Sequence, residues 1–218
     1  MRADGRKELL AIEEGYRESR ESWAQVLRSL RERGMTEPPL LAVGDGGLGL
    51  WAALDEVFPE TRHQRCWNHR TLNVLDKLPR RLHAMYEAPD RQSGIQQQRV
   101  AYCAQLRAQG QADAADCPER DWNDFITFYD FPQERWSHLR TSNPIESIFA
   151  GVRLRTDATK RMRARDNRLY LVFKLATRLS TNWRGINAPN QLYLLLAGYR
   201  FVDGQLQLAQ PSSEQAAA

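Results

Sequence analysis

The stretch Leu40-Leu41-Ala42-Val43-Gly44-Asp45-Gly46-Gly47-Leu48-Gly49 decides the fold of this chain. Its apolar first half is typical of a buried strand, and its glycine-rich second half is a tight turn. A helical pattern of apolar residues follows over 50–58 and ends at Pro59. The sequence therefore predicts a strand, a turn and a helix, with the carboxylate of Asp45 at the end of the strand, a typical position for a functional site.

The same turn matches the dinucleotide-binding pattern G-x-G-x-x-G through Gly44, Gly46 and Gly49. Two features count against a nucleotide there. Asp45 places negative charge where a pyrophosphate needs positive potential. About twenty residues later, where an acid that binds ribose is expected, the chain carries His63-Gln64-Arg65. An arginine would suit the 2′-phosphate of NADP, so this alternative stays open but is disfavoured.

The neighbouring segments alternate between strand and helix patterns. A turn is predicted at Asp4-Gly5, followed by a strand over 6–12, and then a helix that Ser19 caps and Gly34 ends. A short strand is predicted over 61–66. Strands that alternate with helices in this way are typical of a parallel or mixed sheet, so the predicted fold class is α/β.

Composition excludes several classes of protein. The chain has 218 residues, of which 42% are hydrophobic and 27% charged, enough for one good core. No apolar stretch is long enough to span a membrane, and the first residues lack a signal-peptide pattern, so we expect a cytoplasmic protein with no membrane partner. The three cysteines, Cys66, Cys103 and Cys117, have unrelated spacings and do not form a disulfide framework.

Positive charge is concentrated in one segment of the chain. Residues 135–178 hold eleven basic and three acidic residues, a net charge of +8, although the whole chain carries only +4. This excess favours a polyanionic partner, foremost nucleic acid. Trp136, between two arginines, is the candidate for contact with a nucleobase. The candidate DNA-binding residues are Arg135, Trp136, Arg140, Arg153, Arg155, Lys160, Arg161, Arg163 and Arg165.

The middle of the chain, residues 68–140, has a different texture. It is polar and rich in Gln and Ala, with helical patterns over 72–78 and 99–106, and we expect an inserted helical subdomain. Its aromatic residues have spacings that are more typical of a core than of a stacking platform. The last residues, 210–218, contain no core-forming side chains and should be loose.

The Cys66-Trp67-Asn68-His69 motif follows the strand predicted over 61–66. A cysteine and a histidine at this spacing could supply half of a zinc site. The other cysteines and histidines of the chain are not paired at ligand spacing, however. A buried thiol with a hydrogen-bonded histidine is therefore the favoured interpretation.

The Asn143-Pro144-Ile145-Glu146-Ser147 motif is typical of a helix start. Asn143 would be the N-cap, Pro144 the first helical residue, and Glu146 the partner in a capping box. The basic segment continues along this same helix, so Glu146 lies where phosphates would be attracted. Together, Asp45 and Glu146 suggest phosphoryl transfer with two divalent ions, Mg²⁺ or Mn²⁺, although their spacing alone does not establish it.

Several motifs along residues 4–204 occur in a specific order. They are Asp45 in its glycine-rich turn, Val57-Phe58-Pro59, Gln64-Arg65-Cys66-Trp67-Asn68-His69, Asn73-Val74-Leu75-Asp76-Lys77-Leu78-Pro79, Thr141-Ser142-Asn143-Pro144-Ile145-Glu146-Ser147 and Val172-Phe173-Lys174-Leu175. In this order they resemble the Mutator-type transposases of bacterial insertion sequences. The resemblance implies an RNase H-like core over 1–67 and 141–204, an all-helical insertion over 68–140, and a flexible tail over 205–218.

The resemblance also implies a site and its partners. The family uses an Asp-Asp-Glu triad that binds two Mg²⁺ or Mn²⁺ ions. Asp45 is similar to its second Asp and Glu146 to its Glu. Cys66 and His69 match a C-x-x-H signature that shapes the strand end, with Asn143 beside it. The implied partners are the DNA of the transposon ends and target and further copies of the chain, with no small-molecule cofactor.

The first acid of the triad belongs, in the family, to a strand before the Asp4-Gly5 turn. The sequence has no such strand before that turn, and we assign the role to no acid near it. We therefore expect a C-terminal transposase fragment that binds DNA but does not cut or join it alone. The alternative is a non-catalytic protein that binds DNA or dimerises, and so regulates an intact transposase.

Overall fold

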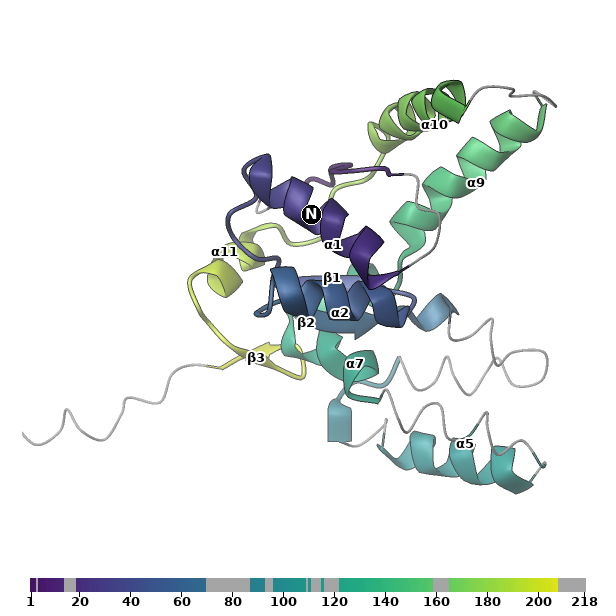
Figure 1. The fold of residues 1–218 in the computed structure, drawn as a ribbon. Helices are drawn as coiled ribbons and strands as arrows, with labels where there is room; N and C mark the ends of the chain where they lie inside the picture. The colour runs from purple at the N-terminus through teal and green to yellow at the C-terminus, as the bar shows by residue number, and fades with distance from the viewer. Residues whose placement is uncertain are drawn as a thin grey trace, which may run out of the picture.

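The structure is a computed structural model that describes residues 1–2, 4–13, 19–69, 87–92, 96–108, 110, 115, 122–158 and 165–207. The described part is mostly helical, with two small sheets (Figure 1). Its elements are α1 (Arg20–Glu32), β1 (Leu41–Gly44), α2 (Leu48–Val57), β2 (Arg62–Arg65), α5 (Gln96–Ala108), α7 (Trp122–Ile126), η2 (Thr127–Asp130), η3 (Gln133–Arg135), α8 (Trp136–Leu139), α9 (Asn143–Ala158), α10 (Arg165–Ser180), α11 (Asn190–Leu196), β3 (Phe201–Val202) and β4 (Gln205–Leu206).

The central sheet confirms the predicted strand, helix, strand unit. β1 and β2 pair in parallel, with Gly44 opposite Arg65, and α2 connects them. α1 packs beside α2 on one face of the sheet, where Trp51 of α2 stacks on His63 of β2 with ring centroids 4.6 Å apart. The predicted cap of α1 is also present, because the Ser19 hydroxyl accepts a hydrogen bond from the Ser22 N–H.

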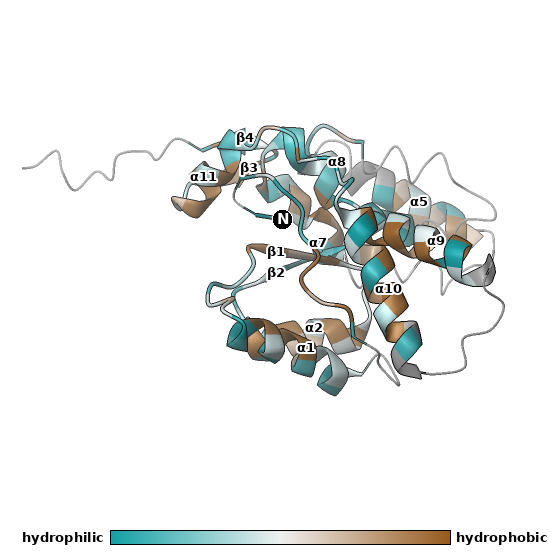
Figure 2. Ribbon diagram, turned by 90° about the horizontal axis from the view of Figure 1, so that it is seen from above, coloured by the Kyte–Doolittle hydropathy of each residue, from teal (hydrophilic) through white to brown (hydrophobic). Residues whose placement is uncertain are grey.

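The opposite face of the sheet carries a second layer. Gln64 of β2, fully buried, points away from α2; its side chain donates to the Phe125 carbonyl at 3.0 Å and accepts from the Phe128 N–H at 2.8 Å. Viewed from above, the sheet lies between the α1–α2 layer and the layer that holds α7 (Figure 2). The aromatic residues of this layer form a buried core, as their spacing predicted: Trp122, Phe125, Phe128, Tyr129, Phe131 and Trp136.

The segment near the N-terminus corrects one prediction. The turn at Asp4-Gly5 is present, because the Gly5 N–H donates to the Arg2 carbonyl at 3.0 Å and Gly5 has a φ of +83°. Residues 6–12 do not form a strand. Instead, Leu9 and Ile12 pack against the apolar contact between α9 and α10. The segment is therefore held by side-chain packing on helices and not by a sheet ladder.

Helices α9 and α10 form a hairpin that projects from the rest of the molecule (Figure 1). Ile148 and Val152 of α9 pack on Ala176 of α10. Gly151 allows the close approach, because a Cβ there would lie 2.7 Å from Cδ1 of Leu179. The predicted helix over 99–106 lies within α5 and is confirmed, whereas that over 72–78 lies outside the described residues. Within the described ranges, no helix has the length and apolarity that a membrane crossing needs.

Candidate active site

The carboxyl ends of β1 and β2 bring two of the predicted residues to the same edge of the sheet. Asp45 directly follows β1, and Cys66 directly follows β2. The Cys66 N–H donates to the Gly44 carbonyl at 2.6 Å, which extends the parallel ladder by one residue. Side chains at the carboxyl ends of adjacent parallel strands point into the same crevice, where α/β proteins place their sites.

Asp45 lies exposed in its glycine turn. Its Oδ1 accepts a hydrogen bond from the Gly47 N–H at 3.0 Å, which fixes the carboxylate against the turn. Gly46 has a φ of +94°, and a Cβ there would lie 2.1 Å from Nε of Arg65. The Arg65 guanidinium thus covers the turn and donates to the Asp45 carbonyl at 3.2 Å. A pyrophosphate would have to approach this covered backbone, which disfavours the dinucleotide interpretation further.

Glu146 reaches the same edge from the first turn of α9. The Ser142 hydroxyl donates to its Oε1 at 2.7 Å, and Nδ1 of His69 lies 3.4 Å from the same oxygen. The sulfur of Cys66 is 4.0 Å from this Oε1. The structure therefore brings Cys66, His69 and Glu146 together around one residue, Ser142, that the sequence analysis did not single out.

Backbone contacts hold α9 against the end of β2. The Trp67 N–H donates to the Arg140 carbonyl at 2.9 Å, and the Ser142 N–H donates to the sulfur of Cys66 at 3.2 Å. Asn68 and Asn143 are joined by a side-chain hydrogen bond. These contacts explain how the Cys66 motif shapes the entry to α9.

The start of α9 differs by one residue from the prediction. The helix begins at Asn143, so Ser142 precedes it, and the Ser142 carbonyl accepts from the N–H of both Ile145 and Glu146. The Glu146 carboxylate is hydrogen-bonded to the side chain of Ser142. A serine just before an Asn-Pro helix start, four residues ahead of a glutamate, is the signal that could have identified this contact.

One group of possible metal ligands lies at this edge, and Asp45 follows the adjacent strand. Cys66, His69 and Glu146 offer ligand atoms that all lie within 4.8 Å of one another. Asp45 is not part of this group, but it ends the strand adjacent to that of Cys66. The Asp45 and Glu146 carboxylates are hard oxygen donors of the kind that Mg²⁺ prefers, whereas thiol and imidazole donors suit zinc.

The predicted DNA contacts of Arg135 and Trp136 find no support in this structure. Both residues are 2% exposed. The Trp136 ring packs edge-on against Phe128 and Tyr129, and its N–H donates to the Phe131 carbonyl. A stacked base needs an open ring face, which this ring lacks. The arginine neighbours of Trp136 in the sequence predicted a surface role, whereas its aromatic neighbours in the fold bury it.

The other predicted DNA contacts fall into three groups. Arg140 is half-buried, and its guanidinium lies 4.9 Å from the ring centre of Phe128. Arg153 and Arg155 are exposed on α9. The remaining predicted contacts lie where side chains are not described: Lys160, Arg161, Arg163 and Arg165.

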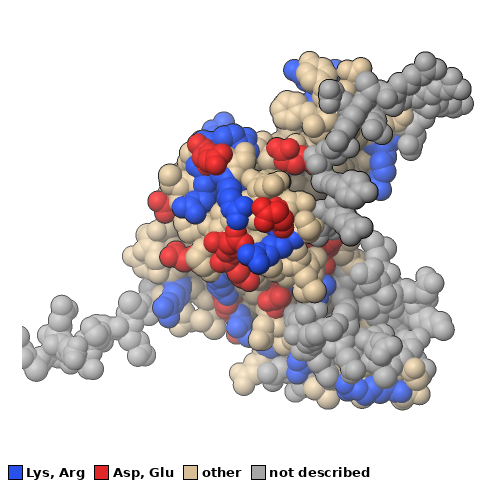
Figure 3. Space-filling model, in the orientation of Figure 1, with Lys and Arg blue, Asp and Glu red and all other residues tan. Residues whose placement is uncertain are grey.

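Charge on the face that carries α1 and α2 is mixed (Figure 3). Acidic and basic side chains alternate there. Arg20 and Arg28 both pair with Glu56 of α2. Because these cations already have carboxylate partners, this face is less suited to a polyanion than the exposed arginines of α9.

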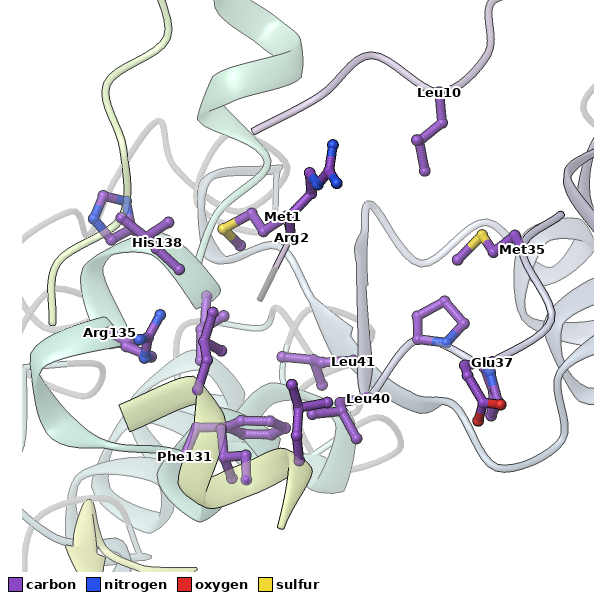
Figure 4. A pocket seen from close by; sticks show the side chains of 17 residues that line it. Met1, Arg2, Leu10, Met35, Glu37, Leu40, Leu41, Phe131, Arg135 and His138 are labelled. Atoms are coloured by element: carbon purple, nitrogen blue, oxygen red, sulfur yellow. The ribbon is translucent and has the colours of Figure 1, made fainter. Parts of the chain in front are cut away.

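A separate cavity of about 360 Å³ lies between the N-terminal residues, the start of β1 and α11 (Figure 4). Its lining is mostly apolar and includes Leu41 and Phe131. The buried Arg135 also lines it; one guanidinium nitrogen donates to the Ala188 carbonyl, and burial lowers the pKa of Arg135. Asp45, Cys66, His69 and Glu146 do not line this cavity.

Comparisons with known proteins agree with the resemblance of the motifs. The model of the Mutator family of transposases matches residues 1–185. The transposase of element IST2 from Acidithiobacillus ferrooxidans is 42% identical over 99% of this chain and 75% of its own length. The transposase of IS6120 from Mycolicibacterium smegmatis is 46% identical over 94% of this chain.

The transposase of ISRM5 from Rhizobium meliloti is 31% identical over 84% of this chain. The chain spans 65% of the IS6120 transposase and 48% of the ISRM5 transposase, so its length corresponds to only a part of these relatives. The extent of the family match, together with identity above 40% to two transposases, confirms the family that the motifs predicted. The chain belongs to the Mutator family of transposases.

Proposed function

We propose that this chain supplies the catalytic core of an insertion-sequence transposase, an enzyme that cuts and joins DNA at the ends of its element. Asp45 and Glu146 are two of its catalytic, metal-binding carboxylates. The proposal is supported by the placement of Asp45 and Cys66 at the ends of adjacent parallel strands, with Oε1 of Glu146 4.0 Å from the Cys66 sulfur. Two acids about a hundred residues apart thereby share one edge of the sheet.

The donor chemistry of the two carboxylates suits a divalent metal ion. One oxygen of each is fixed by the protein, Oδ1 of Asp45 by the Gly47 N–H and Oε1 of Glu146 by the Ser142 hydroxyl. Each carboxylate keeps a second oxygen that can face an ion. Bound Mg²⁺ or Mn²⁺ ions would activate a water or a 3′-hydroxyl and stabilise the leaving oxygen. Asp45 and Glu146 would hold these ions, while the Gly46 turn and Ser142 fix the positions of the carboxylates.

The core is proposed to be RNase H-like, with residues 68–140 as a helical insertion between its two parts, 1–67 and 141–204. A parallel sheet covered by helical layers on both faces is compatible with this fold. By the resemblance of the motifs, residues 1–218 supply two of the three carboxylates of the family's triad. We therefore propose that the 218-residue polypeptide does not cut or join DNA by itself, and that it assembles with further copies in the working enzyme.

Metal binding tests the two carboxylates directly. Mn²⁺ binding to the chain would be measured by electron paramagnetic resonance. We expect Asp45→Asn and Glu146→Gln each to weaken Mn²⁺ binding at least about tenfold, because each removes a charged ligand. The matched control is Glu60→Gln, an exposed acid after α2 whose loss should change nothing. Equal Mn²⁺ affinity in all variants would contradict the proposed site.

Nicking of supercoiled plasmid tests the proposed inactivity. We expect the 218-residue polypeptide to leave plasmid intact with Mg²⁺ or Mn²⁺. Mg²⁺-dependent nicking that disappears in Asp45→Asn would disprove the inactivity while supporting the catalytic role of Asp45. The experiment therefore tests the inactivity of the polypeptide separately from the catalytic role of Asp45.

A regulatory role is the second candidate, favoured by the exposed Arg153 and Arg155 on α9. The chain would then bind DNA, or pair with an intact transposase, without catalysis. Duplex binding should weaken steeply with salt, and Arg153→Ala with Arg155→Ala should reduce the slope of log K against log salt by about 1 for each phosphate that the protein no longer neutralises. Arg200→Ala, an exposed arginine before β3, is the control and should leave the slope unchanged.

A further inference from the structure

Three side chains of different chemistry converge where β2 ends and α9 begins. They are the thiol of Cys66, the imidazole of His69 and the carboxylate of Glu146, and their ligand atoms all lie within 4.8 Å of one another. Thiolate, imidazole and carboxylate are the three donor types that bind zinc in proteins. We propose that Cys66, His69 and Glu146 form a zinc site with one open coordination position, which shares the Glu146 carboxylate with the Mg²⁺ or Mn²⁺ site proposed above.

Two of the three distances between the proposed ligand atoms are close to those of tetrahedral zinc coordination. Zinc bonds of about 2.1 Å to nitrogen and oxygen and 2.3 Å to sulfur place nitrogen and oxygen ligands about 3.4 Å apart, and sulfur and oxygen ligands about 3.6 Å apart. In the structure, Nδ1 of His69 is 3.4 Å from Oε1 of Glu146, and the Cys66 sulfur is 4.0 Å from the same oxygen. The Cys66 sulfur and Nδ1 of His69 lie within 4.8 Å of one another, and side-chain movement must bring these two atoms to about 3.6 Å to complete the geometry.

The Ser142 hydroxyl marks the space that a small ion would use. Its oxygen lies 2.7 Å from Oε1 of Glu146, 3.2 Å from the Cys66 sulfur and 3.4 Å from Nδ1 of His69. These three distances are longer than metal–ligand bonds, but they place one atom among all three donors. For an ion to bind there, the Ser142 side chain would have to rotate about its Cα–Cβ bond and leave this space.

The surroundings also suit a metal thiolate. Cys66 is 1% exposed, and the Ser142 N–H donates to its sulfur at 3.2 Å, the kind of contact that stabilises a ligating thiolate. The His69 and Glu146 side chains are 39% and 38% exposed, so an ion and a water can enter from the solvent side. On binding, the Cys66 thiol loses its proton to solvent and the sulfur forms the bond to zinc.

Cobalt titration tests the site on the full 218-residue chain, with Co²⁺ as a coloured substitute for Zn²⁺. A thiolate ligand gives Co²⁺ a strong near-ultraviolet charge-transfer band, which oxygen and nitrogen ligands do not produce. We expect this band to saturate at one Co²⁺ per chain and to disappear when Zn²⁺ displaces the cobalt. Failure to develop the band at saturating Co²⁺ would overturn the proposal.

Variants assign the ligands. Cys66→Ser should abolish the band, and His69→Gln and Glu146→Gln should each weaken Zn²⁺ binding at least about tenfold. Cys103→Ser, at the other described cysteine, should retain the band. Persistence of the band in Cys66→Ser would disprove the site.

Two measurements separate this site from the proposed function and from misfolding. Asp45→Asn should retain the cobalt band while losing Mn²⁺ affinity. Cys66→Ser should lose the cobalt band while retaining Mn²⁺ affinity. In the unaltered chain, Zn²⁺ should slow alkylation of Cys66 by iodoacetamide, followed by mass spectrometry of the peptide. An unchanged alkylation rate at saturating Zn²⁺ would contradict the site even if the variants fail to fold.

Discussion

Ser142 joins the two halves of the candidate active site through Glu146. Its hydroxyl donates to Oε1 of Glu146 at 2.7 Å, while its backbone N–H donates to the sulfur of Cys66 at 3.2 Å. The Cys66 N–H in turn donates a hydrogen bond to the Gly44 carbonyl at the end of β1. The carboxylate of a helix is thereby fixed relative to two strands.

Ser142→Ala should lower the free energy of unfolding by about 1 kcal/mol, because it removes a hydrogen bond to a partly exposed carboxylate. Urea denaturation would measure the change. Ser147→Ala is a control in the first turns of α9, since Ser147 is exposed and its hydroxyl donates to the Pro144 carbonyl three residues earlier. A smaller effect at Ser142 than at Ser147 would contradict the role given to Ser142.

Gly46→Ala should lower the free energy of unfolding by about 1 to 2 kcal/mol, because Gly46 has a φ of +94° and the new methyl group would displace Arg65. The Asp45 turn would move with it, so Mn²⁺ affinity should also fall. Gly47→Ala is the control, because Gly47 has a φ of −57°, which alanine adopts readily. Equal stability of the two variants would show that the Gly46 turn is not constrained.

Gln64→Leu should lower the free energy of unfolding by about 2 kcal/mol. Leucine has a similar volume, but it leaves the buried Phe128 N–H without the acceptor that Gln64 supplies at 2.8 Å. Thermal and urea denaturation would report the loss. The same substitution at the exposed Gln205 in β4 should stay within about 0.5 kcal/mol of the original chain.

Stability should depend on pH through His138. Burial lowers the pKa of His138, and the charges of Lys7 and Arg135 lower it further, against a hydrogen bond with Asn187 that raises it. Because the folded-state pKa lies below the unfolded value, the unfolded state binds the proton more readily. The stability that neutral His138 contributes is therefore complete above about pH 6.5 and is lost as the pH falls through the folded pKa.

The measurement is urea denaturation at pH 7.5 and pH 5.0. We expect the free energy of unfolding to fall more between these values in the original chain than in His138→Asn, which cannot take up the proton. Identical decreases in the two proteins would show that His138 does not contribute to the pH dependence.

Local sequence patterns predicted the elements that depend on local interactions. The apolar periodicity and the Ser19 cap predicted α1, and the glycine turn predicted β1, α2 and the exposed Asp45 between them. These features need only neighbours within a few residues. The strand predicted over 6–12 does not form, because a strand needs a partner strand. Leu9 and Ile12 pack against helices α9 and α10 instead.

The sequence by itself determined the family, the α/β order of the first third of the chain, and the identity of Asp45, Cys66, His69 and Glu146 as site candidates. Only the tertiary structure placed Ser142 among the last three, and only it buried Trp136, whose arginine neighbours had suggested a surface role. Both outcomes depend on side chains that are far apart in the sequence and meet only when the layers pack. Spacing indicates the contact of Ser142 with Glu146, but it carries no information about the contacts with Cys66 and His69, because packing, and not local conformation, selects them.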